Sequence, residues 1–234
     1  MKLTRRAALL GIAGALCFTG GAVAQVSMTL TGVGNGYVMG GVYTSPYVAT
    51  IDGVSTYVIC DDFTTDVWIN DTWEANQYSL SEVTSSGPQK FTTPDWSPYT
   101  IQEEYDAAAL LAEDVMANMF NATLAGEYSY AIWTIFDPAA INGYGGNSLT
   151  GSQQSAVNSF RTAALTQAAS GGASGLDVSI YTPSPLGASQ EYLVVSTPEA
   201  SLPATLGVEL FALVGVMFLM RRRLVRGRAY THTA

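Results

Sequence analysis

The motif Cys60-Asp61-Asp62-Phe63, followed by Asp66, is the densest group of reactive side chains in this 234-residue chain. Carboxylate oxygens so close together could bind Ca²⁺, which prefers oxygen ligands. The spacing lacks an Asp-x-Asp-x-Asp-Gly loop and a matched glutamate. Asp61, Asp62 and Asp66 are therefore candidate calcium ligands, and the simpler interpretation is a strand end with solvated acids. In a strand, Cys60 and Asp62 share one face, and Asp61 lies on the other.

The chain has a single histidine, His232, which lies close to the C-terminus. No histidine is left elsewhere to act as a general base, a triad member or a metal ligand. Hydrolase sites of the serine–histidine or cysteine–histidine type, and zinc sites built on histidine or paired cysteines, are excluded there. Glycosidase chemistry needs two carboxylates, but no particular pair stands out. We therefore expect no enzyme activity, no resident metal and no cofactor.

The C-terminal segment has three parts: Pro198-Glu199-Ala200, an apolar run from Leu202 to Met220, and the cluster Arg221, Arg222 and Arg223. Nineteen residues of helix, at about 1.5 Å each, reach across a hydrocarbon core of about 30 Å. Arginine accumulates on the cytoplasmic side of membranes. The pattern predicts a membrane helix over 202–220 and a basic cytoplasmic tail over 221–234. A buried core helix followed by a basic tail is the alternative.

This order of parts resembles the PEP-CTERM sorting signal of exported bacterial proteins, with Ala200 where that family has a second proline. The resemblance covers roughly the last 30 residues. It implies an exosortase-like membrane enzyme that recognises Pro198-Glu199 and cuts near it. The protein would then be anchored first and reach the cell surface or the extracellular space after processing.

The N-terminus also indicates export. Lys2, Arg5 and Arg6 precede an apolar stretch, and Ala22-Val23-Ala24 offers the small residues that signal peptidase reads. We expect a signal peptide over 1–24, with the Sec and twin-arginine routes both open. An exported domain over 25–195 and a linker over 196–201 follow.

The exported domain is strongly acidic. It contains 17 acidic residues and only two basic ones, Lys90 and Arg161, so its net charge is −15. Such a surface offers no cationic stripe for nucleic acid. Cys60 is its single cysteine, so the domain has no internal disulfide and must be held by packing.

The N-terminal half of the exported domain is predicted to form strands. The β-branched runs Tyr47–Ile51 and Val54–Ile59 flank Asp52-Gly53, which favours a type I′ hairpin turn. A second hairpin is predicted at Asn70-Asp71, between 63–69 and 73–80. The glycine-rich stretch over 28–42 indicates a flexible strand or a bulged edge.

Helices and further strands follow. Thr100 and Glu103 form a capping box that opens one helix. A second is predicted over 128–136, and a third from near Thr150 to Ser170-Gly171-Gly172. Short strands over 176–181 and 191–195 could return to the sheet. We therefore expect an α+β fold of antiparallel hairpins, then about three helices and short returning strands, plus one C-terminal transmembrane helix.

A second resemblance joins the cysteine motif to Ala131-Ile132-Trp133. The two segments are similar to those of bacterial thioester adhesin domains, in which a cysteine and a glutamine side chain form an internal thioester. Cys60 takes the cysteine position, and Ser129 occupies the glutamine position. Serine offers no acyl group. The resemblance therefore implies a shared fold without the bond, with Cys60 packed close to Ser129 as a free thiol.

Together these observations predict an exported cell-surface or extracellular-matrix protein with a non-catalytic binding or structural role. Its partners would be signal peptidase, an exosortase-like enzyme, and exopolysaccharide or other surface glycans. The alternative is a carbohydrate-binding or thioester-like adhesin domain, with a sugar-stacking platform of Trp68, Trp73, Trp96 and Tyr99. A permanently anchored single-pass membrane protein is the other possibility.

Overall fold

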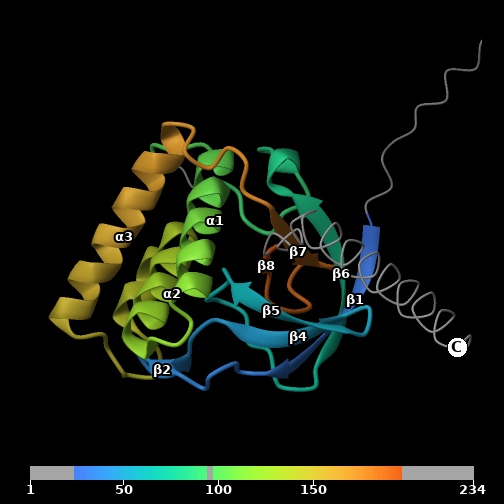
Figure 1. The fold of residues 1–234 in the computed structure, drawn as a ribbon, viewed down its shortest axis with the longest axis horizontal. Coiled ribbons are helices and arrows are strands. Elements are labelled where there is room, and N and C mark those ends of the chain that lie inside the picture. Colours follow the sequence, from blue (N-terminus) through green and yellow to red (C-terminus); the bar gives the residue numbers. More distant parts are fainter. Residues whose placement is uncertain (1–23, 94–96, 197–234) are drawn as a thin grey trace, which may run out of the picture. The chain divides into compact units, whose positions relative to one another are not determined.

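Six antiparallel strands close into a barrel in the order β1-β4-β5-β8-β7-β6 (Figure 1). The computed structural model describes residues 24–93 and 97–196. The barrel strands are β1 (Ala24–Gly32), β4 (Tyr47–Ile51), β5 (Val54–Cys60), β6 (Thr72–Ser79), β7 (Val178–Pro183) and β8 (Tyr192–Val195). The short strands β2 (Val38–Met39) and β3 (Val42–Tyr43) form a separate two-stranded sheet.

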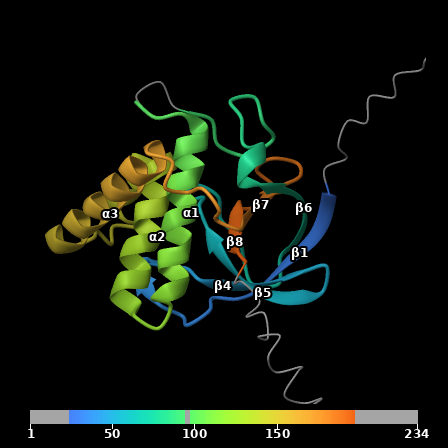
Figure 2. The same cartoon turned by 45° about the horizontal axis from the view of Figure 1, so that its top comes forward.

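Three helices and two 3₁₀ turns complete the described part of the chain. They are α1 (Ile101–Ala117), α2 (Ala122–Phe136), α3 (Gly151–Ala169), η1 (Leu80–Glu82) and η2 (Pro138–Asn142). The helices pack on one another at one side of the barrel, and α3 lies farthest from the strands in both Figure 1 and Figure 2. Helices α1 and α2 provide the contacts to the barrel, at β8 and β5 respectively.

The helix ends follow local signals in the sequence. Thr100 and Glu103 form the predicted capping box of α1, with the Thr100 N–H donating to Glu103 Oε2 at 2.7 Å. Thr150 and Gln153 do the same for α3. Helix α2 begins earlier than predicted, because the Asn121 side chain accepts a hydrogen bond from the Leu124 N–H and caps it.

The predicted fold class is wrong, because the strands form a closed barrel rather than hairpins followed by returning strands. The hairpin of β4 and β5 is present, with positive φ at both Asp52 and Gly53. The second predicted hairpin, at Asn70-Asp71, is absent from the structure. Residues 63–69 form no strand, and β6 pairs instead with β1 and β7. The glycine-rich stretch over 28–42 contains the second part of β1, which has a register shift between Leu30 and Gly32, and continues into β2 and the start of β3.

None of the helices in 24–93 and 97–196 combines the length and the apolar character needed to cross a bilayer. The fold prediction included such a helix over 202–220. That segment, the linker motif and the signal peptide lie outside the described residues.

The pairing register separates the two faces of the barrel wall. Cys60 is paired with Tyr192, and Tyr192 with Tyr181, so these side chains share one face across three strands. The same register places Met28, Leu30, Tyr47, Ala49, Val58, Trp73 and Ala75 on this face, which forms the barrel core. Inside it, the Trp73 and Tyr192 rings stack with centroids 5.8 Å apart. Cys60 is therefore a residue of the barrel interior.

The opposite face of β5, β8 and β7 is also buried, because the helices cover it. Ile59, Leu193 and Ile180 form one row of it. The next row is polar, with Thr182 opposite Glu191 in the same register and Asp61 opposite Glu191 on the other side. A strand buried on both faces can only carry such polar groups if they are paired or protonated.

Candidate functional site

Cys60 and Ser129 are connected through one residue, Ser45. The Cys60 N–H donates to Ser45 Oγ at 3.1 Å, and the Ser45 N–H donates to Ser129 Oγ at 3.1 Å. All three residues are completely buried. The Ser129 hydroxyl is itself used by the α2 backbone, since it donates to the Ala125 carbonyl at 2.7 Å. The structure thus places the end of β5 beside α2, with a serine pair between them.

The Cys60 thiol is held in an environment that keeps it protonated. It donates to the Asp62 carbonyl at 3.1 Å, and Trp133 Nε1–H donates to the Cys60 carbonyl at 2.8 Å. Burial, then the neighbouring carboxyl groups of Asp62 and Asp61, raises the pKa of the Cys60 thiol well above its usual range. Because the thiolate is the nucleophile, this cysteine is unsuited to nucleophilic catalysis in the folded protein.

Asp61 and Glu191 form a buried pair of acids between the barrel wall and α1. Glu191 Oε1 accepts the Tyr105 hydroxyl of α1, and Oε2 accepts the Thr182 hydroxyl and the Lys90 N–H, the last at 2.9 Å. Neither side-chain oxygen of Asp61 accepts a hydrogen bond from a described residue. Burial, then the neighbouring Glu191 and Asp62, raises the pKa of Asp61 well above its usual range. Burial also raises the pKa of Glu191.

Asp62 is paired with Lys90, which belongs to the loop between η1 and α1. Lys90 Nζ contacts Asp62 Oδ2 directly, and the two side chains are 13% and 0% exposed. Lys90 Nζ also donates to Thr65 Oγ1 at 2.6 Å. The other carboxyl oxygen, Asp62 Oδ1, accepts the Thr64 N–H at 2.9 Å and the Thr64 hydroxyl at 2.8 Å. Asp62 is therefore fully engaged by protein groups.

The candidate calcium ligands do not converge. Asp62 faces Lys90, Asp61 lies on the α1 side of the wall, and Asp66 is exposed in the following loop. Within 24–93 and 97–196, no group of three or more His, Cys, Asp or Glu side chains is arranged to hold a metal ion.

An open apolar groove of about 500 Å³ lies next to this network. Trp68, Tyr43 and Tyr144 line it and are 73%, 50% and 52% exposed. Leu30 and Tyr47 of the barrel core also line it, so the groove reaches the barrel interior. The remaining lining residues are Val33, Val38, Gly41, Val42, Asp66, Val67, Ile69 and Gln190.

Gln190 joins the groove to the cysteine motif. Its side-chain amide donates to the Asp62 carbonyl at 3.1 Å and its side-chain oxygen accepts the Tyr192 hydroxyl at 2.9 Å. Tyr47 connects the two as well, because it lines the groove and shares the barrel interior with Cys60. A ligand in the groove would therefore lie against side chains that are fixed by the barrel core.

The predicted sugar-stacking platform is not assembled from the four residues proposed. Trp68 lies in the groove, but Trp73 is buried in the barrel. Tyr99 lines a different, smaller hollow beside α3, and Trp96 lies outside the described residues. Tyr43 and Tyr144 take their place. No pattern in the sequence indicates Tyr144. The sequence identifies Lys90 as one of two basic residues of an acidic domain, but it does not predict the pairing of Lys90 with Asp62.

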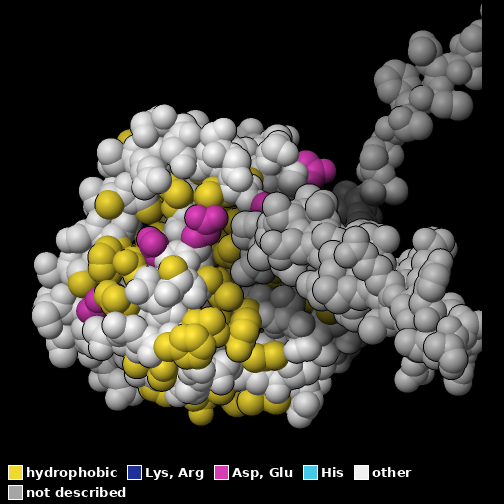
Figure 3. Space-filling model, viewed as in Figure 1, with side chains coloured by type: hydrophobic (Ala, Val, Ile, Leu, Met, Phe, Trp, Pro, Cys, Tyr) yellow, Lys and Arg dark blue, Asp and Glu magenta, His cyan; other side chains and the backbone are white. Residues whose placement is uncertain are grey.

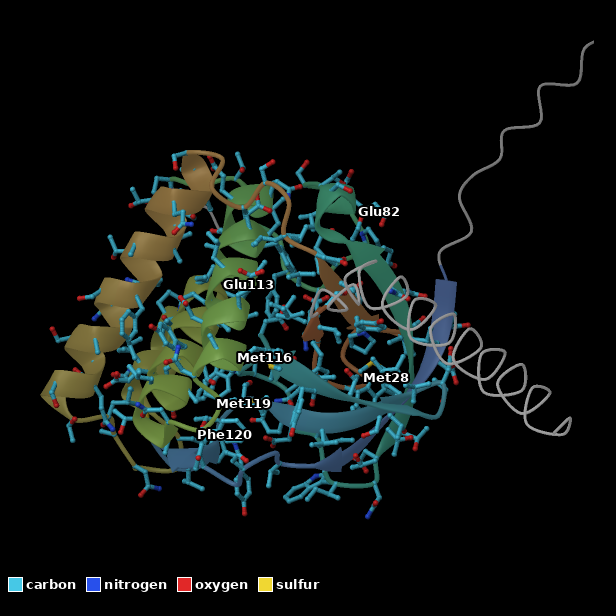
Figure 4. All side chains as sticks on the ribbon, viewed as in Figure 1. Met28, Glu82, Glu113, Met116, Met119 and Phe120 are labelled. Carbon is cyan, nitrogen blue, oxygen red and sulfur yellow. The ribbon has the colours of Figure 1, made fainter. Side chains whose placement is uncertain are left out.

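A second apolar surface lies at the C-terminal end of α1. Figure 3 shows hydrophobic side chains gathered on this face, where the described residues present acidic side chains and no Lys or Arg. Figure 4 places Met116, Met119 and Phe120 there. Phe120 is 81% exposed, and its carbonyl accepts the Tyr37 hydroxyl at 3.2 Å.

The predicted sorting residues Pro198, Glu199 and Ala200, and the cluster Arg221, Arg222 and Arg223, lie outside the described residues. The chain matches no protein-family model, and neither the curated proteins nor the solved structures contain a significant match.

Proposed function

We propose that this chain is an exported cell-surface or extracellular-matrix protein that acts by binding, without catalysis, and that it binds a neutral glycan in the Trp68 groove. The observation that carries the proposal is the gathering of three exposed aromatic side chains, Trp68, Tyr43 and Tyr144, around one hollow. Binding pockets typically combine such apolar walls with a few polar groups.

The polar groups of the groove suit a sugar. Asp66 and Gln190 lie among the aromatic side chains and can exchange hydrogen bonds with hydroxyl groups. Amphipathic rings such as Trp and Tyr offer flat apolar faces to the C–H faces of a sugar ring. The net charge of −15 for residues 25–195 repels anionic polymers, which favours a neutral glycan over an acidic one.

The binding test uses the purified protein on an array of neutral oligosaccharides, followed by titration of the strongest binder. Trp68→Ala is expected to lower the affinity at least tenfold. Phe120→Ala is the matched control, because it removes an exposed aromatic side chain outside the groove. No binding to any glycan, or equal binding by Trp68→Ala, would remove the glycan proposal.

For delivery, we propose signal peptidase cleavage before Gln25 and exosortase-like processing near Pro198-Glu199. The support is the resemblance of the C-terminal sequence to PEP-CTERM signals, together with the signal-peptide pattern. Mass spectrometry of the mature protein, with and without the processing enzyme, tests this step. Retention of Arg221, Arg222 and Arg223 in the mature protein would contradict it and favour a permanently anchored protein.

A further inference from the structure

Lys90 and Asp62 present an amine and a carboxyl group to one another at a largely buried place. Asp62 is completely buried, the Lys90 side chain is 13% exposed, and Nζ contacts Oδ2 directly. The contact joins two segments that lie 28 residues apart in the sequence. Holding two reacting groups in contact removes most of the entropic barrier to a bond between them.

The two oxygens of Asp62 are in different environments. Oδ1 accepts two hydrogen bonds from Thr64, one from its N–H at 2.9 Å and one from its hydroxyl at 2.8 Å. Oδ2 faces the amine. Donors on one oxygen stabilise the negative charge that develops when a nucleophile adds to the carboxyl carbon. Thr64 therefore polarises Asp62 for attack from the Lys90 side.

Two further acids lie beside this pair and can carry protons. Asp61 is the chain neighbour of Asp62, and Glu191 Oε2 accepts a hydrogen bond from the backbone N–H of Lys90 at 2.9 Å. Both are buried, and neither oxygen of Asp61 accepts a hydrogen bond from a described residue. Burial raises the pKa of both carboxyls, so the pair holds a proton more readily than exposed acids do.

We propose that Lys90 and Asp62 condense into an internal amide bond between Lys90 Nζ and Asp62 Cγ. The ammonium group first passes one proton to the Asp61–Glu191 pair. The neutral amine then attacks Cγ, and Oδ1 carries the developing charge against Thr64. Oδ2 leaves as water with one proton from the nitrogen and one from the acid pair. No oxidant, reductant or co-reactant is needed.

The bond would fasten the loop before α1 to the end of β5. It would tie this loop covalently to the barrel wall, where Lys90 contacts Asp62 and Glu191. An exported domain with one cysteine has no internal disulfide, and a covalent amide would restrict its unfolded chain in the same way.

Peptide mapping of the full chain after denaturation tests the proposal. The expected result is a branched peptide that contains Asp62 and Lys90 and is lighter by one water than the two separate peptides. Lys90 should also resist acetylation in denaturant, while the α-amino group is labelled as an internal control. Separate peptides of full mass, with Lys90 acetylated, would overturn the proposal.

Two variants locate the chemistry. Lys90→Arg keeps the positive charge but is not an effective nucleophile, so it should give only unbranched peptides. Glu191→Gln keeps both reacting groups and should lower the branched fraction at least tenfold at equal times after synthesis. An undiminished branched fraction in Glu191→Gln would overturn the proton-carrying role. The wild-type result decides the bond itself even if a variant fails to fold.

Discussion

Asp61 and Glu191 lie directly opposite each other at the ends of β5 and β8, with the Asp61 N–H donating to the Glu191 carbonyl at 3.4 Å. Both side chains are completely buried under α1 and the loop that carries Lys90. Glu191 is surrounded by donors from Tyr105, Thr182 and the Lys90 backbone. The acid without such donors, Asp61, must therefore be the one that stays protonated.

Because of this pair of buried acids, we expect the free energy of unfolding to decrease as the pH rises. The folded state raises the pKa of both Asp61 and Glu191, so it binds more protons than the unfolded chain. Stability is fully present below the unfolded Asp pKa of about 3.9 and is lost as the pH rises through the folded values. Urea unfolding of Asp61→Asn should show a weaker pH dependence than the wild type at pH values above the unfolded Asp pKa of about 3.9. Identical slopes in the variant and the wild type would contradict this.

The Cys60 thiol is predicted to be unreactive in the folded protein. It is buried, its pKa is raised, and its partner position Ser129 has no acyl group for a thioester. A thiol reagent should label Cys60 only after unfolding. Peptide mapping, which separates Cys60 from Cys17, checks this. A peptide lighter by one ammonia, or rapid labelling under native conditions, would show that the site is reactive.

Two tryptophans five residues apart in sequence are predicted to differ strongly in their effect on stability. Trp73 is 7% exposed and stacks on Tyr192 inside the barrel, so Trp73→Ala should cost about 3–5 kcal/mol. Trp68 is 73% exposed in the groove, and Trp68→Ala should change the free energy of unfolding by less than about 0.5 kcal/mol. Chemical denaturation measures both. Equal losses would mean that Trp68 supports the fold rather than a ligand.

Two glycines with positive φ provide a matched test of the contact between β2 and α2. Alanine at Gly36 (φ 69°) or Gly40 (φ 55°) adopts a left-handed conformation that costs about 1–2 kcal/mol. At Gly40 the new Cβ would also overlap the Tyr130 hydroxyl and lie 2.8 Å from Leu149 Cδ1. At Gly36 it meets nothing within 4 Å.

Gly40→Ala should therefore be less stable than Gly36→Ala by about 1–3 kcal/mol, because its new methyl group overpacks the contact with Tyr130. Thermal unfolding of the two variants checks the difference. Equal melting temperatures would show that Tyr130 moves aside at no cost.

The sequence correctly predicted the helix caps and the turn that depend only on neighbouring residues. The capping boxes at Thr100 and Thr150 and the turn at Asp52-Gly53 are satisfied within a few residues, so their structures follow from neighbouring side chains. Asn70 also has a positive φ, as a turn residue can, but its N–H donates to the Leu30 carbonyl in β1. A turn signal does not say which strand the chain will pair with after the turn.

The sequence by itself determined the charge of the domain, its lack of histidine before position 232, its single cysteine after position 17, and most of its helix limits. Only the tertiary structure decided that β1 closes the barrel by pairing with both β4 and β6. It also decided that Asp61 meets Glu191 and that Lys90 meets Asp62. The reason is that strand partners and burial depend on contacts between distant segments, whereas composition, caps and turns are properties of adjacent residues.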